Sequence, residues 1–123
     1  MGQEQRRFVR VTSRLNATFK VVKTGKVKRA LTKDISAGGI CCVTEELLEA
    51  GIAVEVELRL PDRAAPILLL GEVAWSRPIG SQHKSYQNPT GEAGVQFTKI
   101  DPKDQALIIQ YAKMNAPPPS PPP

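Results

Sequence analysis

The stretch from Ile52 to Leu60, IAVEVELRL, alternates apolar and polar residues almost strictly. A period of two is typical of a β-strand that buries one face and exposes the other. We therefore predict a half-buried strand over residues 52–60, and the fold of the chain has to provide a sheet in which this strand can lie.

Five further segments have the composition of short strands, with β-branched, aromatic or other apolar side chains between turn-forming residues. They cover residues 17–22, 27–35, 40–44, 66–75 and 94–98. Gly71 interrupts the fourth of these segments, and we expect that strand to bend there. Between the strands we predict one helical turn over residues 45–50, a tight turn over residues 61–63 and an exposed loop over residues 78–90.

A single helix is predicted near the end of the chain. Asp101 can serve as its N-cap, Pro102 suits the first helical position, and Asp104 adds a negative charge near the positive end of the helix dipole. The helix would continue over residues 105–115. The segment APPPSPPP follows and is predicted to be a polyproline II tail.

Six short strands followed by one helix predict an all-β fold, a six-stranded antiparallel β-barrel with a C-terminal α-helix that covers one opening. The length of 123 residues and an apolar content of 41% suit one domain. We expect three parts. Residues 1–11 form a flexible N-terminal arm, residues 12–115 form the barrel and helix, and residues 116–123 form a disordered tail.

Positive charge is concentrated in the first third of the chain. Residues 1–36 hold ten Lys and Arg against two acidic residues, a balance of +8, whereas the whole chain carries +5. This asymmetry favours an anionic partner. The sequence has no apolar run long enough for a membrane span and no secretory signal, so we expect a cytoplasmic protein.

The residues that support catalysis or metal binding are scarce. Cys41 and Cys42 are neighbours, so on a strand they point to opposite faces and cannot form a redox pair or a metal clip. The chain has one histidine, His83, in the predicted loop, and Ser36 has no evident base. We therefore expect a binding module, with no enzyme activity, no metal and no cofactor.

Two short motifs combine the residue types that a nucleotide requires. Arg6, Arg7 and Arg10 stand ahead of the first strand, and arginine forks match phosphate oxygens and the guanine O6/N7 edge. Asp34 and Ser36, in the stretch KDISAGGI, would project from the same side of an extended chain. The two glycines permit positive φ and close approach of a ligand, although Asp and Ser commonly support a turn through their own backbone.

The spacing Arg6-x-x-x-Arg10, followed by Asp34-x-Ser36-x-x-Gly39, resembles the two-part motif of the PilZ domain family, the bacterial receptors for cyclic di-GMP. The segments Gly71–Trp75 and Gly94–Phe97 are similar to late strands of that family. The resemblance covers roughly residues 5–114. It implies a stand-alone receptor that relays the level of this second messenger to an unidentified effector protein.

The resemblance also implies a role for each matching residue. The ligand-binding residues would be Arg6, Arg7, Arg10, Asp34, Ser36, Gly38 and Gly39. The arginines would grip phosphates and guanine Hoogsteen edges, with Arg7 in a supporting position. Asp34 and Ser36 would bond a guanine donor edge, and the glycines would keep the turn open. We expect the arm to close over the barrel when the nucleotide binds. Trp75 could approach a base, but a lone tryptophan late in a strand more often belongs to the core, and we expect it there.

Two other functions fit parts of the sequence. A protein-interaction adaptor with the same fold and no nucleotide would use the exposed loop and the Pro-rich tail. A basic barrel that binds single-stranded nucleic acid would use the charge of residues 1–36, but such proteins interleave aromatic residues as stacking platforms. Only Phe8 and Phe19 are aromatic in that third, so a nucleic-acid partner is not expected.

Overall fold

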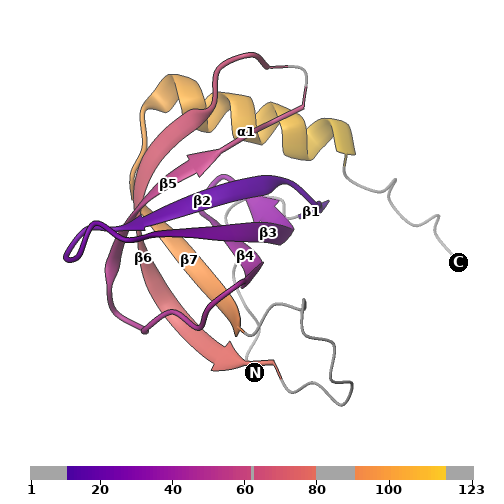
Figure 1. Ribbon diagram of the computed structural model, residues 1–123. Coiled ribbons are helices and arrows are strands. Elements are labelled where there is room, and N and C mark those ends of the chain that lie inside the picture. Colours follow the sequence, from indigo (N-terminus) through magenta and orange to yellow (C-terminus); the bar gives the residue numbers. More distant parts are fainter. Residues whose placement is uncertain (1–10, 62, 80–90, 116–123) are drawn as a thin grey trace, which may run out of the picture.

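The computed structural model describes residues 11–61, 63–79 and 91–115 of the chain. Within these residues the secondary structure is mostly strand, with one helix near the C-terminal end (Figure 1). The elements in chain order are β1 (Val11–Thr12), β2 (Asn16–Val21), β3 (Val27–Ser36), β4 (Gly39–Thr44), β5 (Ala53–Leu58), β6 (Ile67–Pro78), β7 (Gly91–Lys99) and α1 (Pro102–Asn115).

The strands close into a barrel. Their order in the sheet is β1-β3-β2-β5-β6-β7-β4, every pairing is antiparallel, and an additional pairing of β3 with β4 closes the circle. Strands β2 to β7 form the six-stranded barrel, and the two-residue β1 adds to β3. The predicted all-β barrel with a C-terminal helix is confirmed.

Alternation along β5 produces the core as predicted. Val54, Val56 and Leu58 point inward and are almost completely buried, whereas Glu55 between them is exposed. Phe19 from β2 is fully buried in the same cluster. Burying a side chain of this size contributes roughly 1.5–3 kcal/mol, so these inward positions supply much of the driving force for closing the barrel.

The helix begins as its sequence predicts. The Asp101 carboxylate accepts a hydrogen bond from the backbone N–H of Lys103 at 2.8 Å, which satisfies one of the donors that a helix start leaves unpaired. Ile108 is fully buried in the barrel core. The Tyr111 hydroxyl and the Ser13 hydroxyl share a hydrogen bond of 2.7 Å. These contacts hold α1 along one end of the barrel (Figure 1).

The predicted helical turn over residues 45–50 is wrong. The segment is an irregular bend that leads to Gly51, which has a φ of 90°. The Thr44 hydroxyl donates to the backbone carbonyl of Glu46 at 2.6 Å and occupies an acceptor that a helix would use. Leu48 is buried in the core, so tertiary burial and this side-chain bond override the local helical preference.

Strands β6 and β7 are longer than predicted. β6 extends three residues beyond Trp75 to Pro78, and β7 begins at Gly91 instead of Gly94. Pro78 pairs with Gly91, so the two extensions form one continuous ladder. The predicted loop therefore begins after Pro78, and residues 80–90 lie outside the described residues, as does the Pro-rich tail.

No helix among the residues that the structure describes is long and apolar enough to cross a membrane.

Candidate functional site

The β3–β4 hairpin presents the second motif. β3 ends at Ser36, β4 begins at Gly39, and these two residues face each other in the ladder. Ile35 points into the core and is fully buried. Neighbours on a strand point to opposite faces, so Asp34 and Ser36 both point to the outer face of the barrel, as expected. Asp34 is half-buried there.

The Ser36 hydroxyl supports the hairpin turn. Its Oγ accepts a hydrogen bond from the backbone N–H of Gly38 at 3.2 Å and donates to the carbonyl of Gly39 at 3.4 Å. The interpretation of a turn supported by its own serine therefore holds for this residue. The same hydroxyl lies at the wall of a groove, where a ligand group that replaced these long bonds would still find a donor and an acceptor.

Strand β7 and helix α1 also hold the hairpin turn in place. The backbone N–H of Phe97 in β7 donates to the carbonyl of Gly38 at 3.0 Å. The amide of Gln105 in α1 donates to the carbonyl of Ala37 at 3.2 Å. The turn is thus anchored to a strand and to the helix, so its position relative to the barrel is well defined.

Gly39 was expected to permit positive φ or the close approach of a ligand, but the structure gives a different reason for a glycine at this position. Among the described glycines, Gly25 and Gly51 have positive φ, whereas Gly38 and Gly39 in this hairpin do not. A Cβ atom at Gly39 would lie 2.5 Å from the backbone oxygen of Val95 in β7. The absent side chain therefore allows β4 to pack closely on β7.

A groove runs along the outer face beside this turn. Its volume is about 930 Å³, near the upper end of the range for small-molecule sites. The turn forms one wall, and side chains and backbone of β6, β7 and α1 form the rest. Its lining comprises Ser36–Cys41, Ala74, Trp75, Gly94–Ile100 and Gln105. Ser36, Gly38 and Gly39 of the predicted site are thus brought to one cavity.

Trp75 lines this groove and is not a core residue, so that expectation is wrong. Val73 is buried, and strict alternation would turn Trp75 inward as well. The β6–β7 register shifts between Val73 and Trp75, which reverses the alternation and places the indole on the outer face, 42% exposed. A Cβ at Gly94 would lie 2.2 Å from the indole nitrogen, so the ring lies against this glycine.

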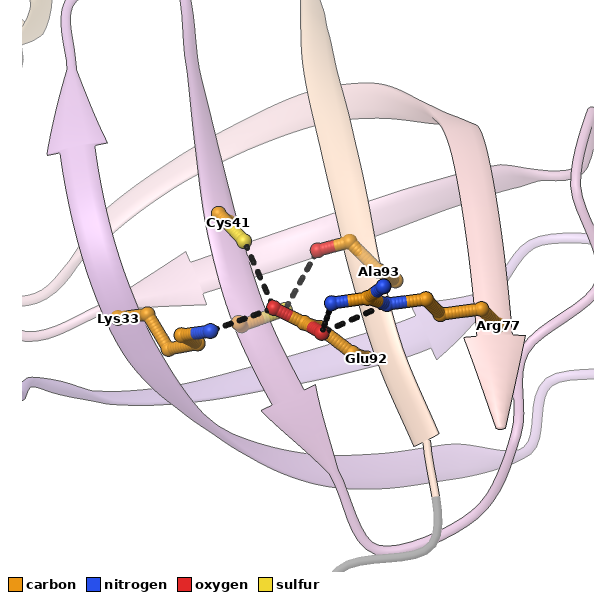
Figure 2. Close-up of polar contacts among 6 residues, drawn as sticks. Lys33, Cys41, Arg77, Glu92 and Ala93 are labelled. Carbon is orange, nitrogen blue, oxygen red and sulfur yellow. Dashed lines mark hydrogen bonds and ion pairs between the residues drawn. The ribbon is translucent and has the colours of Figure 1, made fainter. Parts of the chain in front are cut away.

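Figure 2 shows a charged cluster on β3, β6 and β7 that sequence reasoning missed. It adjoins the groove through Cys41, which lines the groove and contacts Glu92. Glu92 of β7 is nine-tenths buried on the outer face, and its two carboxylate oxygens are shared between two cations. Oε1 accepts bonds from Arg77 Nε at 2.9 Å and Arg77 Nη2 at 2.6 Å. Oε2 accepts a bond from Lys33 Nζ at 2.6 Å. The hydrogen bonds from Lys33 and Arg77 lower the pKa of Glu92, and the bond to Glu92 raises the pKa of Lys33.

The two cysteines point to opposite faces, as expected, and both thiols are free and buried. Cys42 lies in the core cluster, where burial raises its pKa to about 12. Cys41 lines the groove, and its Sγ lies 3.7 Å from Glu92 Oε2. Burial and the charges of Asp34 and Glu92 raise its pKa. Both sulfurs therefore remain thiols near neutral pH, and neither is an activated nucleophile.

No group of three or more His, Cys, Asp or Glu side chains in residues 11–61, 63–79 and 91–115 has a geometry that could hold a metal ion. The three arginines of the first motif, Arg6, Arg7 and Arg10, lie outside the described residues. β1 is the point at which their segment joins the barrel. Val11 pairs with Ile35 and Thr12 pairs with Asp34, so β1 runs directly alongside the second motif.

The family model of the PilZ domain matches residues 4–113 of this chain. The chain belongs to the PilZ domain family. PilZ domains are known as receptor domains rather than enzymes. No curated protein matches the chain.

Solved structures share this PilZ fold at low sequence identity. The PilZ domain of YcgR from Escherichia coli, determined with c-di-GMP, is 15% identical with a TM-score of 0.69, and the match covers 92% of this chain and 95% of that one. The Bacillus subtilis inhibitor of motility MotI/DgrA is 20% identical with a TM-score of 0.69. MrkH, a c-di-GMP-dependent transcription regulatory factor, is 19% identical with a TM-score of 0.70.

These matches differ in how much of the other chain they cover. This chain spans about half of MotI/DgrA and of MrkH, 51% and 50% of their lengths, and 91% and 89% of its own residues take part.

Proposed function

We propose that this PilZ domain is a receptor for cyclic di-GMP that relays the nucleotide level to an effector protein. The observation that carries the proposal is the pairing of β1 with β3. It places Val11 and Thr12, which directly follow the arginine motif in sequence, opposite Ile35 and Asp34. The segment that carries the arginines therefore joins the barrel beside the second motif, whose Ser36, Gly38 and Gly39 line the groove of about 930 Å³.

The chemistry of these residues matches the ligand. Cyclic di-GMP carries two phosphates and two guanines, so it calls for cationic planar donors and for acceptors of a guanine donor edge. Arg6 and Arg10 supply the donors. Asp34 and Ser36 supply acceptors on the outer face of β3. Trp75 adds an exposed aromatic surface in the groove.

Calorimetric titration tests the proposal directly. We expect the full chain to bind cyclic di-GMP and to bind cyclic di-AMP much more weakly, because the two ligands share a phosphodiester ring and differ in their base edges. A titration without heat at high micromolar cyclic di-GMP would overturn the proposal. Equal affinity for both nucleotides would show that the groove reads only phosphates and would contradict the roles of Asp34 and Ser36.

The relay to an effector is proposed as a closing of the N-terminal arm. Ligand phosphates would neutralise the repulsion among the arginines and bridge them to the β3 turn. Amide hydrogen exchange of residues 2–11 should therefore slow when cyclic di-GMP is added at saturation. Equally fast exchange with and without the nucleotide would contradict this mechanism while leaving nucleotide binding itself intact.

A further inference from the structure

Glu92, Lys33 and Arg77 form a cluster whose charges suit an anionic ligand. One carboxylate is surrounded by two cations, which leaves an excess of one positive charge. The carboxylate is only 7% exposed, whereas Lys33 and Arg77 are 50% and 66% exposed. The negative charge is therefore covered, and the positive charges face outward.

The cluster adjoins the groove. Every second residue of β7 points outward, so Gln96, Gly94 and Glu92 form a row on the outer face. Neighbouring positions in this row are about 7 Å apart along the strand. Gln96 and Gly94 line the groove. Glu92 is the next position along this row, and the groove residue Cys41 contacts it at 3.7 Å.

Arg77 is held in a defined orientation at this end of the groove. It pairs with Glu92 in the β6–β7 ladder, and both Nε and Nη2 donate to the same carboxylate oxygen. These bonds leave the Nη1 group of the guanidinium outside the contact with Glu92. The Arg77 Cζ atom lies 6.0 Å from the centroid of the Trp75 ring, and Trp75 lines the groove.

We infer that Arg77 is a further ligand contact of this domain, donating to an acceptor oxygen of the bound cyclic dinucleotide, and that Glu92 is its positioning residue. The inference rests on the proposed function and extends the site beyond the two motifs. A guanidinium fixed through one edge loses little side-chain freedom when its other edge binds an oxygen. The bound nucleotide would then lie along the outward row of β7. It would contact the hairpin turn at one end, Trp75 in the middle and Arg77 at the other end.

The role of Glu92 can be separated from its charge. Replacing Glu92 with Gln removes a negative charge beside a site for an anionic ligand. If Glu92 acted only through long-range electrostatics, Glu92→Gln would bind the nucleotide more tightly. If Glu92 positions Arg77, the same variant binds more weakly, because a neutral amide holds a guanidinium less firmly than a carboxylate does.

Calorimetry with cyclic di-GMP on the full chain tests the inference. We expect Kd to rise on the order of 10- to 100-fold in Arg77→Ala. A smaller rise of about 3- to 10-fold is expected in Arg77→Lys, which retains the charge without the planar fork, and in Glu92→Gln. Arg59→Ala and Glu57→Gln serve as matched controls, because this pair forms an ion pair of 3.3 Å and neither residue lines the groove. Their Kd should stay within about twofold of the wild type.

The outcomes separate the inference from the function on which it rests. An unchanged Kd in Arg77→Ala, with the wild type binding, overturns the contact and leaves the receptor function standing. Tighter binding by Glu92→Gln overturns the positioning role. A purely structural Glu92 would lower the melting temperature and leave the Kd of the folded fraction unchanged, which calorimetric stoichiometry reveals. A wild type that does not bind overturns both proposals.

Discussion

At the scale of single residues, the buried carboxylate of Glu92 links β3 to β6. It combines burial with charged hydrogen bonds from two strands that are not adjacent to each other in the barrel. Lys33 lies 59 positions away in the sequence and Arg77 lies 15 positions away. The motif residues Asp34, Ser36 and Gly39 could be proposed as site residues from the sequence because their spacing is local. Glu92 could not, because only strand register brings its partners together.

Removing the Glu92 carboxylate should destabilise the barrel. Glu92→Ala eliminates three charge-assisted hydrogen bonds and leaves Lys33 and Arg77 facing each other. Because both cations remain half-exposed, we expect a loss of about 1–3 kcal/mol in the free energy of unfolding. Urea denaturation measures this change. The more exposed pair of Glu57 and Arg59 provides the control, and Glu57→Ala should cost less than about 1 kcal/mol.

The same carboxylate predicts a pH dependence. The pKa of Glu92 is lowered in the folded state from an ordinary value of 4.5. Its stabilisation is therefore present above pH 4.5 and is lost as the pH falls through the folded-state pKa. Unfolding free energies measured between pH 6 and pH 3 should fall more steeply for the wild type than for Glu92→Gln. Parallel curves would show that Glu92 titrates normally in the fold.

At the scale of elements, the positions of the strands in the sequence were easier to predict than the register in which they pair. Alternation and turn residues located six strands and the start of the helix. They could not reveal the register shift between Val73 and Trp75, because a bulge depends on how two strands pair. That shift turns the indole from the core to the groove. The bend over residues 45–50 was missed for a related reason, since burial of Leu48 is decided by the closed barrel.

Gly39 on β4 and Gly94 on β7 should respond differently to an added methyl group. In Gly94→Ala the new Cβ meets the Trp75 side chain, which can move, so we expect a shifted emission of this sole tryptophan and a modest loss of stability. In Gly39→Ala the Cβ meets the backbone oxygen of Val95, so we expect a loss of about 1–3 kcal/mol. Fluorescence spectra and urea denaturation of both variants provide the comparison. Unchanged emission in Gly94→Ala would contradict the packing of the indole on this glycine.

At the scale of the whole molecule, barrel closure brings distant parts of the chain to one surface. β3 pairs with β1, β2 and β4, so its end carries the junction with the N-terminal segment as well as the hairpin turn. The number of predicted strands, and the position of the single helix after them, were enough to predict the fold class. They did not predict that β6, β7 and α1 would complete the groove, because local apolar and turn patterns do not reveal which strands become neighbours when the sheet closes.

The central claim is that the arginine motif and the β3 turn hold one ligand together. A calorimetric double-mutant cycle with Arg10→Ala, Asp34→Ala and the double variant tests it most directly. We expect losses in cyclic di-GMP binding of about 2–4 kcal/mol for Arg10→Ala and about 1–3 kcal/mol for Asp34→Ala. If both residues contact the same bound nucleotide, as proposed, the double variant should lose less than the sum of the two. Wild-type affinity in either single variant would contradict the account.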